Sequence, residues 1–314
     1  MTARRWRDLA TGALLIAALW FAARVMTANW SSVREAGVSL APRWSGIVAS
    51  ALIVLACYAI LIETWRRMVR TWGSQLAAGD AAHIWFVSNL GRYVPGKVWQ
   101  IGAMGMLAQR AGVAPDAAVG SSLVLAIVNI LAGLAVILGR GSGALDLMGI
   151  PRVTAFIGGA AALGATLALP WLLPMIVRAF NRVTGRALRE PRVPLAAILA
   201  AFVGCALAWL GYGIAFSNFA AALVPPPSAA TVNAHIVAFT LSYLAGYLAV
   251  FAPGGIGVRE LSLAALLTTW LGYSSGDAGI IVLTSRVWLT VLEVLPGAAL
   301  LALAALTNLR TKPS

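Results

Sequence analysis

The chain has 314 residues, of which 61% are apolar and only 11% are charged, and its mean hydropathy is +0.87. Charged residues make up roughly a quarter of a soluble globular domain, so this composition excludes a soluble fold and predicts an all-α polytopic membrane protein. The net charge of +13 is explained by basic loops that follow the positive-inside rule, and nucleic-acid binding is not expected.

The N-terminal stretch combines basic residues with a long apolar run. Arg4, Arg5 and Arg7 precede an apolar stretch that starts at Leu9. This stretch has about the ~20 residues that a spanning helix needs, and no small-x-small cleavage site precedes Asn29. We therefore expect an uncleaved first transmembrane helix.

Eight apolar runs follow one another along the chain. Six of them predict single spans, at 9–28, 44–62, 117–138, 153–177, 194–222 and 278–308. The other two, 82–108 and 235–271, are each interrupted by proline and glycine. Each flank of the first interruption is only about ten residues long, too short to cross a bilayer. These two runs predict broken or re-entrant helical hairpins.

The second interruption, residues 251–260, reads Phe-Ala-Pro-Gly-Gly-Ile-Gly-Val-Arg-Glu. Proline and glycine end a helix and free backbone groups that lipid cannot satisfy. Arg259 and Glu260 follow the glycines directly. Because ionisable side chains at membrane depth are costly, the pair predicts a functional site, and the alternative is an ion pair that holds two helices together.

The two interruptions occupy corresponding places in two halves of the chain. Pro95 and Pro253 lie 158 residues apart, and at this offset Gly96 aligns with Gly254. Each half then reads span, span, broken hairpin, span. We predict one transmembrane domain, 1–314, built from pseudo-repeat halves 1–145 and 146–314.

The distribution of Lys and Arg predicts the topology. If each hairpin enters and leaves on one side of the membrane, 14 of these residues are cytoplasmic and 5 lie at or near the outer side. This satisfies the positive-inside rule and places both termini in the cytoplasm. Each half then has an odd number of full spans, so the halves form an inverted repeat.

A surplus of positive charge is predicted inside the membrane. The cations there are Arg92, Lys97, Arg259 and Arg286, and the carboxylates are Glu260 and Glu293. Two carboxylates cannot neutralise four cations, so the surplus predicts an anionic guest such as a lipid phosphate. Arg286 and Glu293 are seven residues apart, two turns along one helix face, and can point into one cavity.

Backbone and side-chain donors complete the predicted binding site. Gly254, Gly255 and Gly257 expose amides where a half-helix begins, which is a ready anion site. Further donors flank the first interruption, namely Asn89, Tyr93, Trp99 and Gln100. These four residues bind a headgroup or, alternatively, satisfy the broken backbone.

Catalytic chemistry is not indicated. The sequence lacks a Gly-x-Ser-x-Gly turn, a His-Glu-x-x-His pair, a phosphate-binding loop and a dinucleotide fingerprint. Cys57 and Cys205 lie inside apolar runs and predict neither a disulfide nor a metal site. We predict no catalytic residue, metal or cofactor. An intramembrane lipid-modifying enzyme with Glu260 as a base remains an alternative.

The segments 88–100, Ser-Asn-Leu-Gly-Arg-Tyr-Val-Pro-Gly-Lys-Val-Trp-Gln, and 253–260 resemble the lysylphosphatidylglycerol synthase transmembrane, flippase-like family. The resemblance implies an inner-membrane domain related to the part of the multiple peptide resistance factor that moves aminoacylated phospholipid between leaflets. The resemblance covers the membrane domain of the full-length synthases and not their aminoacyl-transfer domain, so it does not imply lysyl transfer. Some relatives are attached to glycosyltransferases.

The leading hypothesis is therefore a flippase or transporter that moves an anionic phospholipid or lipid-linked substrate between leaflets. The predicted site lies between the hairpin tips, where the cations hold phosphate and the carboxylates balance charge or carry a coupled proton. The alternative from another class is a non-transporting scaffold for a cell-envelope enzyme or glycosyltransferase, held through the basic loop at 178–192.

Overall fold

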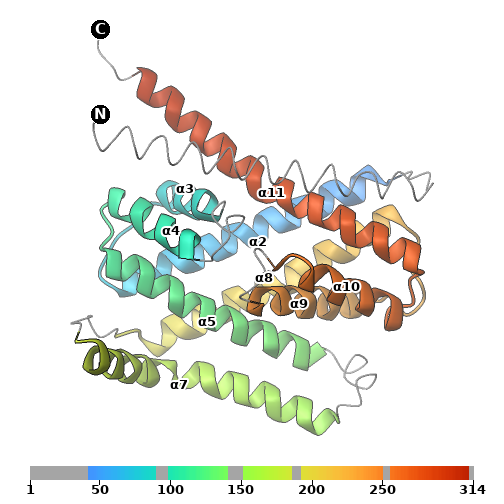
Figure 1. The fold of residues 1–314 in the computed structure, drawn as a ribbon, viewed down its shortest axis with the longest axis horizontal. Helices are drawn as coiled ribbons and strands as arrows, with labels where there is room; N and C mark the ends of the chain where they lie inside the picture. Colours follow the sequence, from blue (N-terminus) through green and yellow to red (C-terminus); the bar gives the residue numbers. More distant parts are fainter. Residues whose placement is uncertain (1–41, 90–97, 141–150, 186–191, 250–254, 311–314) are drawn as a thin grey trace.

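The computed structural model describes residues 42–89, 98–140, 151–185, 192–249 and 255–310, and the regular elements in these segments are all α-helices (Figure 1). The helices are α2 (Trp44–Thr71), α3 (Ala78–Asn89), α4 (Val98–Arg110), α5 (Pro115–Arg140), α7 (Arg152–Thr184), α8 (Leu195–Leu223), α9 (Val232–Leu248), α10 (Val258–Thr269) and α11 (Ser275–Arg310).

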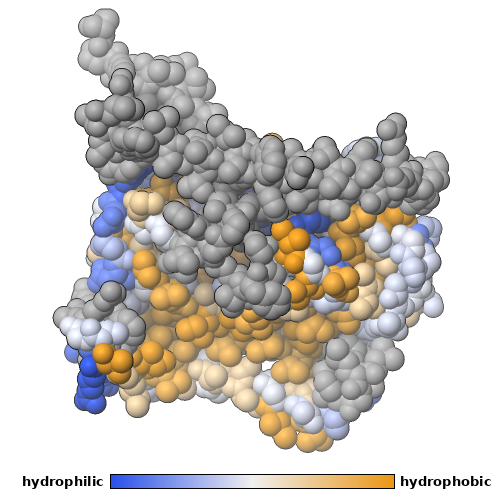
Figure 2. All heavy atoms as spheres, viewed as in Figure 1, coloured by the Kyte–Doolittle hydropathy of each residue, from blue (hydrophilic) through white to orange (hydrophobic). Residues whose placement is uncertain are grey.

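Five described helices are long and apolar enough to cross a membrane. They are α2, α5, α7, α8 and the Ser275–Leu300 part of α11. Figure 2 shows a broad hydrophobic band across the described part of one face, with hydrophilic residues gathered at its left edge, as lipid contact requires. The prediction of an all-α polytopic membrane protein is confirmed, while the predicted first span, 9–28, lies outside the described residues.

The two interrupted runs form pairs of short helices. α3 packs against α4, and α9 packs against α10. A helix of 12 residues, the length of α3 and of α10, is about 18 Å long at ~1.5 Å per residue, less than the ~30 Å hydrocarbon core. Each pair is therefore a broken hairpin, as predicted from the proline and glycine interruptions.

Glycines allow α2 and α8 to pack closely at the centre of the fold. A Cβ on Gly204 would lie 2.5 Å from the Thr64 hydroxyl oxygen, and a Cβ on Gly46 would lie 2.9 Å from the Ala222 Cβ. Small residues at such positions let helix backbones approach and gain van der Waals contact, which is a main source of helix association in lipid.

These central contacts follow the 158-residue offset. Gly46 corresponds to Gly204 and Thr64 to Ala222, so the Gly46–Ala222 contact becomes the Gly204–Thr64 contact when the halves are exchanged. Residue numbers rise along α2 as they fall along the facing α8, so the two helices are antiparallel. A twofold axis that exchanges antiparallel neighbours is perpendicular to them, as in an inverted repeat.

The packing of the other helices follows the same exchange. At the 158-residue offset α3 corresponds to α9, α4 to α10 and α5 to α11. The contact between α3 and α11 therefore corresponds to the contact between α9 and α5, and the α4–α5 contact corresponds to the α10–α11 contact. The division into halves 1–145 and 146–314 remains a prediction, and these paired contacts support it.

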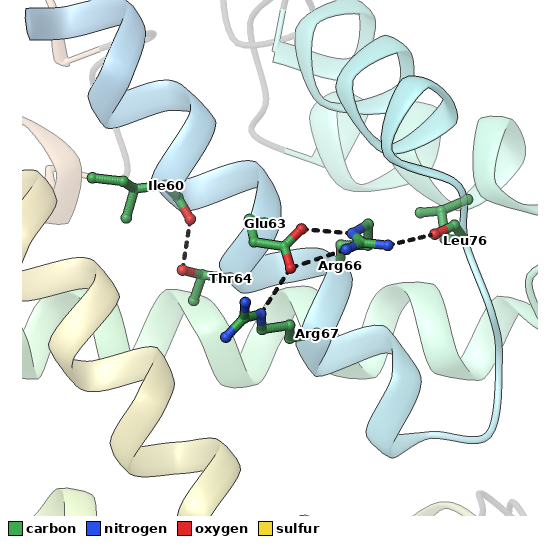
Figure 3. A network of polar contacts seen from close by, with 6 residues as sticks. All are labelled: Ile60, Glu63, Thr64, Arg66, Arg67 and Leu76. Carbon is green, nitrogen blue, oxygen red and sulfur yellow. Dashed lines mark hydrogen bonds and ion pairs between the residues drawn. The ribbon is translucent and has the colours of Figure 1, made fainter.

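A local ion-pair network occupies one end of α2 (Figure 3). Arg66 Nε and Arg67 Nε donate to the Glu63 carboxylate at 2.6 Å and 2.7 Å. Arg66 Nη1 also donates to the Leu76 carbonyl oxygen at 3.4 Å, which ties α2 to the segment before α3. Glu63 is thus neutralised by its own helix, separately from the charges on α10 and α11.

Candidate functional site

The site is built around the break between α9 and α10. A Cβ on Gly255 would lie 2.8 Å from the carbonyl oxygen of Gly246, and Gly255 has φ of +71°. Gly257 has φ of +85°. L side chains rarely adopt such angles, so only glycine lets the chain turn back so tightly against α9. This turn places the first residues of α10 beside α9.

Arg259 lies in the first turn of α10 and is only 7% exposed. Its guanidinium carbon lies 4.6 Å from the centroid of the Tyr243 ring and 5.4 Å from that of Phe239. Both aromatic residues belong to α9 and hold the cation by cation–π attraction. Arg259 Nη2 is buried and has no hydrogen-bond partner within the described segments.

Glu260 caps the N-terminal end of α10. Its Oε2 accepts a hydrogen bond of 2.7 Å from the Gly257 amide, and its Oε1 lies 3.4 Å from Arg286 Nη1 on α11. A carboxylate at the third helical position satisfies a free amide and interacts favourably with the helix dipole. Glu260 therefore caps its own helix and links α10 to α11.

The carboxylate and guanidinium of α11 are also buried. Arg286 is 7% exposed and Glu293 is 8% exposed. Arg259 experiences the charges of Arg286, Glu260 and Glu293. The structure thus brings together the four predicted charged residues of the second half of the chain.

The remaining predicted site residues are placed less completely. Asn89 is buried at the end of α3, which packs on α11. Gln100 belongs to α4, but its side chain lies outside the described part of the structure, as does that of Trp99. Arg92, Tyr93, Lys97 and Gly254 also lie outside the described residues.

The described charges balance. Arg259 and Arg286 are matched by Glu260 and Glu293, and these two arginines are the only buried cations in the described segments. The predicted cationic surplus therefore depends on Arg92 and Lys97, whose position relative to Arg259 stays a prediction.

Sequence reasoning missed the aromatic residues that surround Arg259. Phe239 and Tyr243 are four residues apart on α9, on one helix face. They continue into an aromatic cluster in which the Trp209 ring lies 5.5 Å from Tyr243 and the Phe216 ring lies 5.2 Å from Phe239. The i, i+4 spacing was visible in the sequence, but nothing there indicated that Arg259 would lie over these rings.

A second buried polar group joins the opposite end of the same helices. His235 on α9 is 1% exposed, and its ring nitrogens lie 2.9 Å from the Thr231 carbonyl oxygen and 3.0 Å from the Tyr273 hydroxyl. If Nδ1 donates to the Thr231 carbonyl, Nε2 accepts from Tyr273. This link connects α9 to the turn between α10 and α11.

Together these features define a class of protein: a polytopic helical membrane protein with buried opposite charges at a broken helix. The chain belongs to the family described as the lysylphosphatidylglycerol synthase TM region, which it matches over residues 9–297. No curated protein shows significant similarity to the chain.

Proposed function

We propose that the protein moves an anionic phospholipid or a lipid-linked phosphate between the leaflets of the bacterial inner membrane, with both termini in the cytoplasm. The observation that carries the proposal is the buried Arg259 guanidinium, whose Nη2 lacks a hydrogen-bond partner within the described segments. Leaving a buried charged donor unsatisfied costs more than the ~1–3 kcal/mol of a neutral one. An anion that enters this site would recover that cost.

The surroundings of Arg259 suit a phosphate. The guanidinium lies at the N-terminal end of α10, where helix amides and dipole favour negative charge. Arg286 supplies a second cation from α11. A guanidinium presents several donors in a plane, which matches the oxygens of a phosphodiester.

The architecture also suits transport. In membrane transporters, substrate sites lie where helices are interrupted near the bilayer midplane, at the interface of two repeats. Arg259 and Glu260 follow such an interruption directly. The family to which the chain belongs is named for a phospholipid synthase, which agrees with a lipid substrate.

The test is translocation by the purified protein in liposomes that contain fluorescent phosphatidylglycerol, followed by dithionite quenching. Arg259→Ala should reduce the rate about tenfold to a hundredfold, the effect of losing a ~1.5–3 kcal/mol hydrogen bond to a charged group. Arg259→Lys keeps the charge and should retain part of the activity. Arg110→Ala, at the exposed end of α4, is the matched control and should behave as wild type.

Folding is checked by gel filtration and thermal unfolding in detergent. A folded Arg259→Ala variant that translocates at the wild-type rate would overturn the proposal. The scaffold alternative makes the opposite prediction, because it places the function in the basic loop at 178–192. Neutralising the five arginines of this loop should then abolish function while Arg259→Ala remains active; they are Arg178, Arg182, Arg186, Arg189 and Arg192.

A further inference from the structure

Glu260 holds two of the donors that an incoming phosphate would use. The Gly257 amide donates to its Oε2 at 2.7 Å, and Arg286 Nη1 lies 3.4 Å from its Oε1. Arg259 Nη2, on the adjacent residue, is the donor left without a partner in the described structure. A carboxylate and a phosphodiester both present two oxygens to such donors, so the two groups compete for the same atoms.

The charge balance of the site also opposes the binding of a phosphodiester while both carboxylates are ionised. The described charges around the site are Arg259 and Arg286 against Glu260 and Glu293. A phosphodiester adds one negative charge, and an uncompensated charge in a poorly solvated site is costly. One proton on a carboxylate restores the balance. Glu260 is partly exposed, with 23% of its side chain accessible, whereas Glu293 is buried. Water therefore reaches the Glu260 carboxylate more easily.

Two neighbouring helices contribute the other charged or titratable groups around Arg259 and Glu260. α9 contributes Tyr243 beside Arg259, and α11 contributes Arg286 and Glu293. The other titratable side chains described on these two helices are either exposed or bound to other groups. Tyr247 is exposed, Asp277 is bound to Ser274 at the start of α11, and His235 is bound to Tyr273.

We infer that Glu260 is an internal competitor for the anionic headgroup, and that headgroup binding is linked to the uptake of one proton by Glu260. This inference rests on the proposed function. On binding, the phosphodiester accepts hydrogen bonds from Arg259, Arg286 and the Gly257 amide, while the displaced carboxylate takes one proton from water. On release, Glu260 returns that proton and recovers its two donors. The net charge of the site is the same in both states.

The inference is tested by titrating the purified, lipid-depleted protein with soluble dihexanoyl phosphatidylglycerol in a calorimeter. Wild type should bind more tightly at about pH 5.5 than at about pH 7.5, by up to about tenfold per pH unit for one linked proton. Buffers with different ionisation enthalpies should report the uptake of about one proton per lipid bound. Titration with dihexanoyl phosphatidylcholine, whose net charge is zero, shows whether binding depends on the net charge of the lipid.

Glu260→Gln is the decisive variant. Its amide oxygen still accepts from the Gly257 amide, so the helix cap is kept, but the charge and the linked proton are removed. It should bind the anionic lipid more tightly than wild type at about pH 7.5 and show no pH dependence. Glu63→Gln, whose carboxylate is paired within α2, should keep the wild-type pH dependence.

The outcomes separate this inference from the proposed function. If wild type and Arg259→Ala both fail to bind the lipid at either pH, the proposed function fails. If lipid binding depends on Arg259 but Glu260→Gln keeps the wild-type affinity and pH dependence, only the competitor role fails. Loss of the pH dependence in Glu293→Gln but not in Glu260→Gln also overturns it, because the proton then belongs to Glu293.

Discussion

Gly246 on α9 and Gly255 before α10 touch backbone to backbone, because a Cβ on Gly255 would lie 2.8 Å from the Gly246 carbonyl oxygen and 2.9 Å from its Cα. A Cβ on Gly246 would in turn lie 2.9 Å from the Cβ of Arg259. This contact therefore determines how closely Arg259 approaches the rings of Phe239 and Tyr243.

The first prediction concerns this contact. Gly255→Ala should lower the free energy of unfolding by about 2 kcal/mol or more, because alanine at positive φ costs ~1–2 kcal/mol and the added Cβ strikes backbone. Gly279→Ala is the control, since its Cβ would meet nothing within 4 Å on α11. Thermal unfolding in detergent compares the two. Equal stability of both variants would show that the backbone contact does not exist.

A second prediction concerns the packing of α2 on α8. Gly204→Ala should destabilise the protein by about 1–3 kcal/mol, since its Cβ would lie 2.5 Å from the Thr64 hydroxyl oxygen. Thr64→Ala removes that oxygen, so the double variant should be more stable than the sum of the two single effects predicts. Gly164→Ala, which meets nothing within 4 Å, should cost little. Strict additivity of the pair would contradict the contact.

The third prediction concerns the aromatic residues that hold Arg259. Phe239→Leu keeps an apolar side chain but removes a ring that lies 5.4 Å from the guanidinium. Cation–π attraction is worth ~0.5–2 kcal/mol, so lipid translocation should fall about twofold to thirtyfold. Phe219→Leu is the matched control, because Phe219 is also buried but stacks on Trp288. Similar rates in the two variants would rule out a role for the ring beyond packing.

The fourth prediction concerns Tyr273, in the turn before α11. Burial, followed by the charge of Asp277, raises the pKa of Tyr273 to about 12, above the ~10 of an unfolded tyrosine. The stability from the protonated hydroxyl is therefore complete below about pH 10 and is lost as pH rises towards 12. Tyr273→Phe should remove this alkaline loss.

The same substitution tests the hydrogen bond to His235. Removing the hydroxyl leaves His235 Nε2 buried without its 3.0 Å partner, at a cost of ~1–3 kcal/mol near neutral pH. Thermal unfolding at neutral and alkaline pH measures both effects. If Tyr273→Phe keeps the wild-type stability at neutral pH, the hydroxyl does not support His235.

Much of the fold was predictable from local features of the sequence. Apolar runs of spanning length indicated α2, α5, α7, α8 and α11, because lipid admits only helices whose backbone groups are satisfied internally. Proline and glycine indicated the breaks after α3 and after α9, since neither residue continues a helix. The sequence aligned Pro95 with Pro253, and the structure adds Gly46 and Gly204, which lie at the same offset and both make close contacts between α2 and α8.

The partners of the buried charges were decided only by the tertiary structure. The sequence placed Arg286 and Glu293 on one face of a helix, but Arg286 also reaches Glu260 on α10. Likewise, no periodicity placed Arg259 over Tyr243. Helix periodicity and chain breaks are local properties, readable from neighbouring residues. Which side chains meet across helices depends on how closely the backbones pack, and here that distance depends on glycine contacts between helices, at Gly246 and Gly255 for α9 and α10 and at Gly204 for α2 and α8.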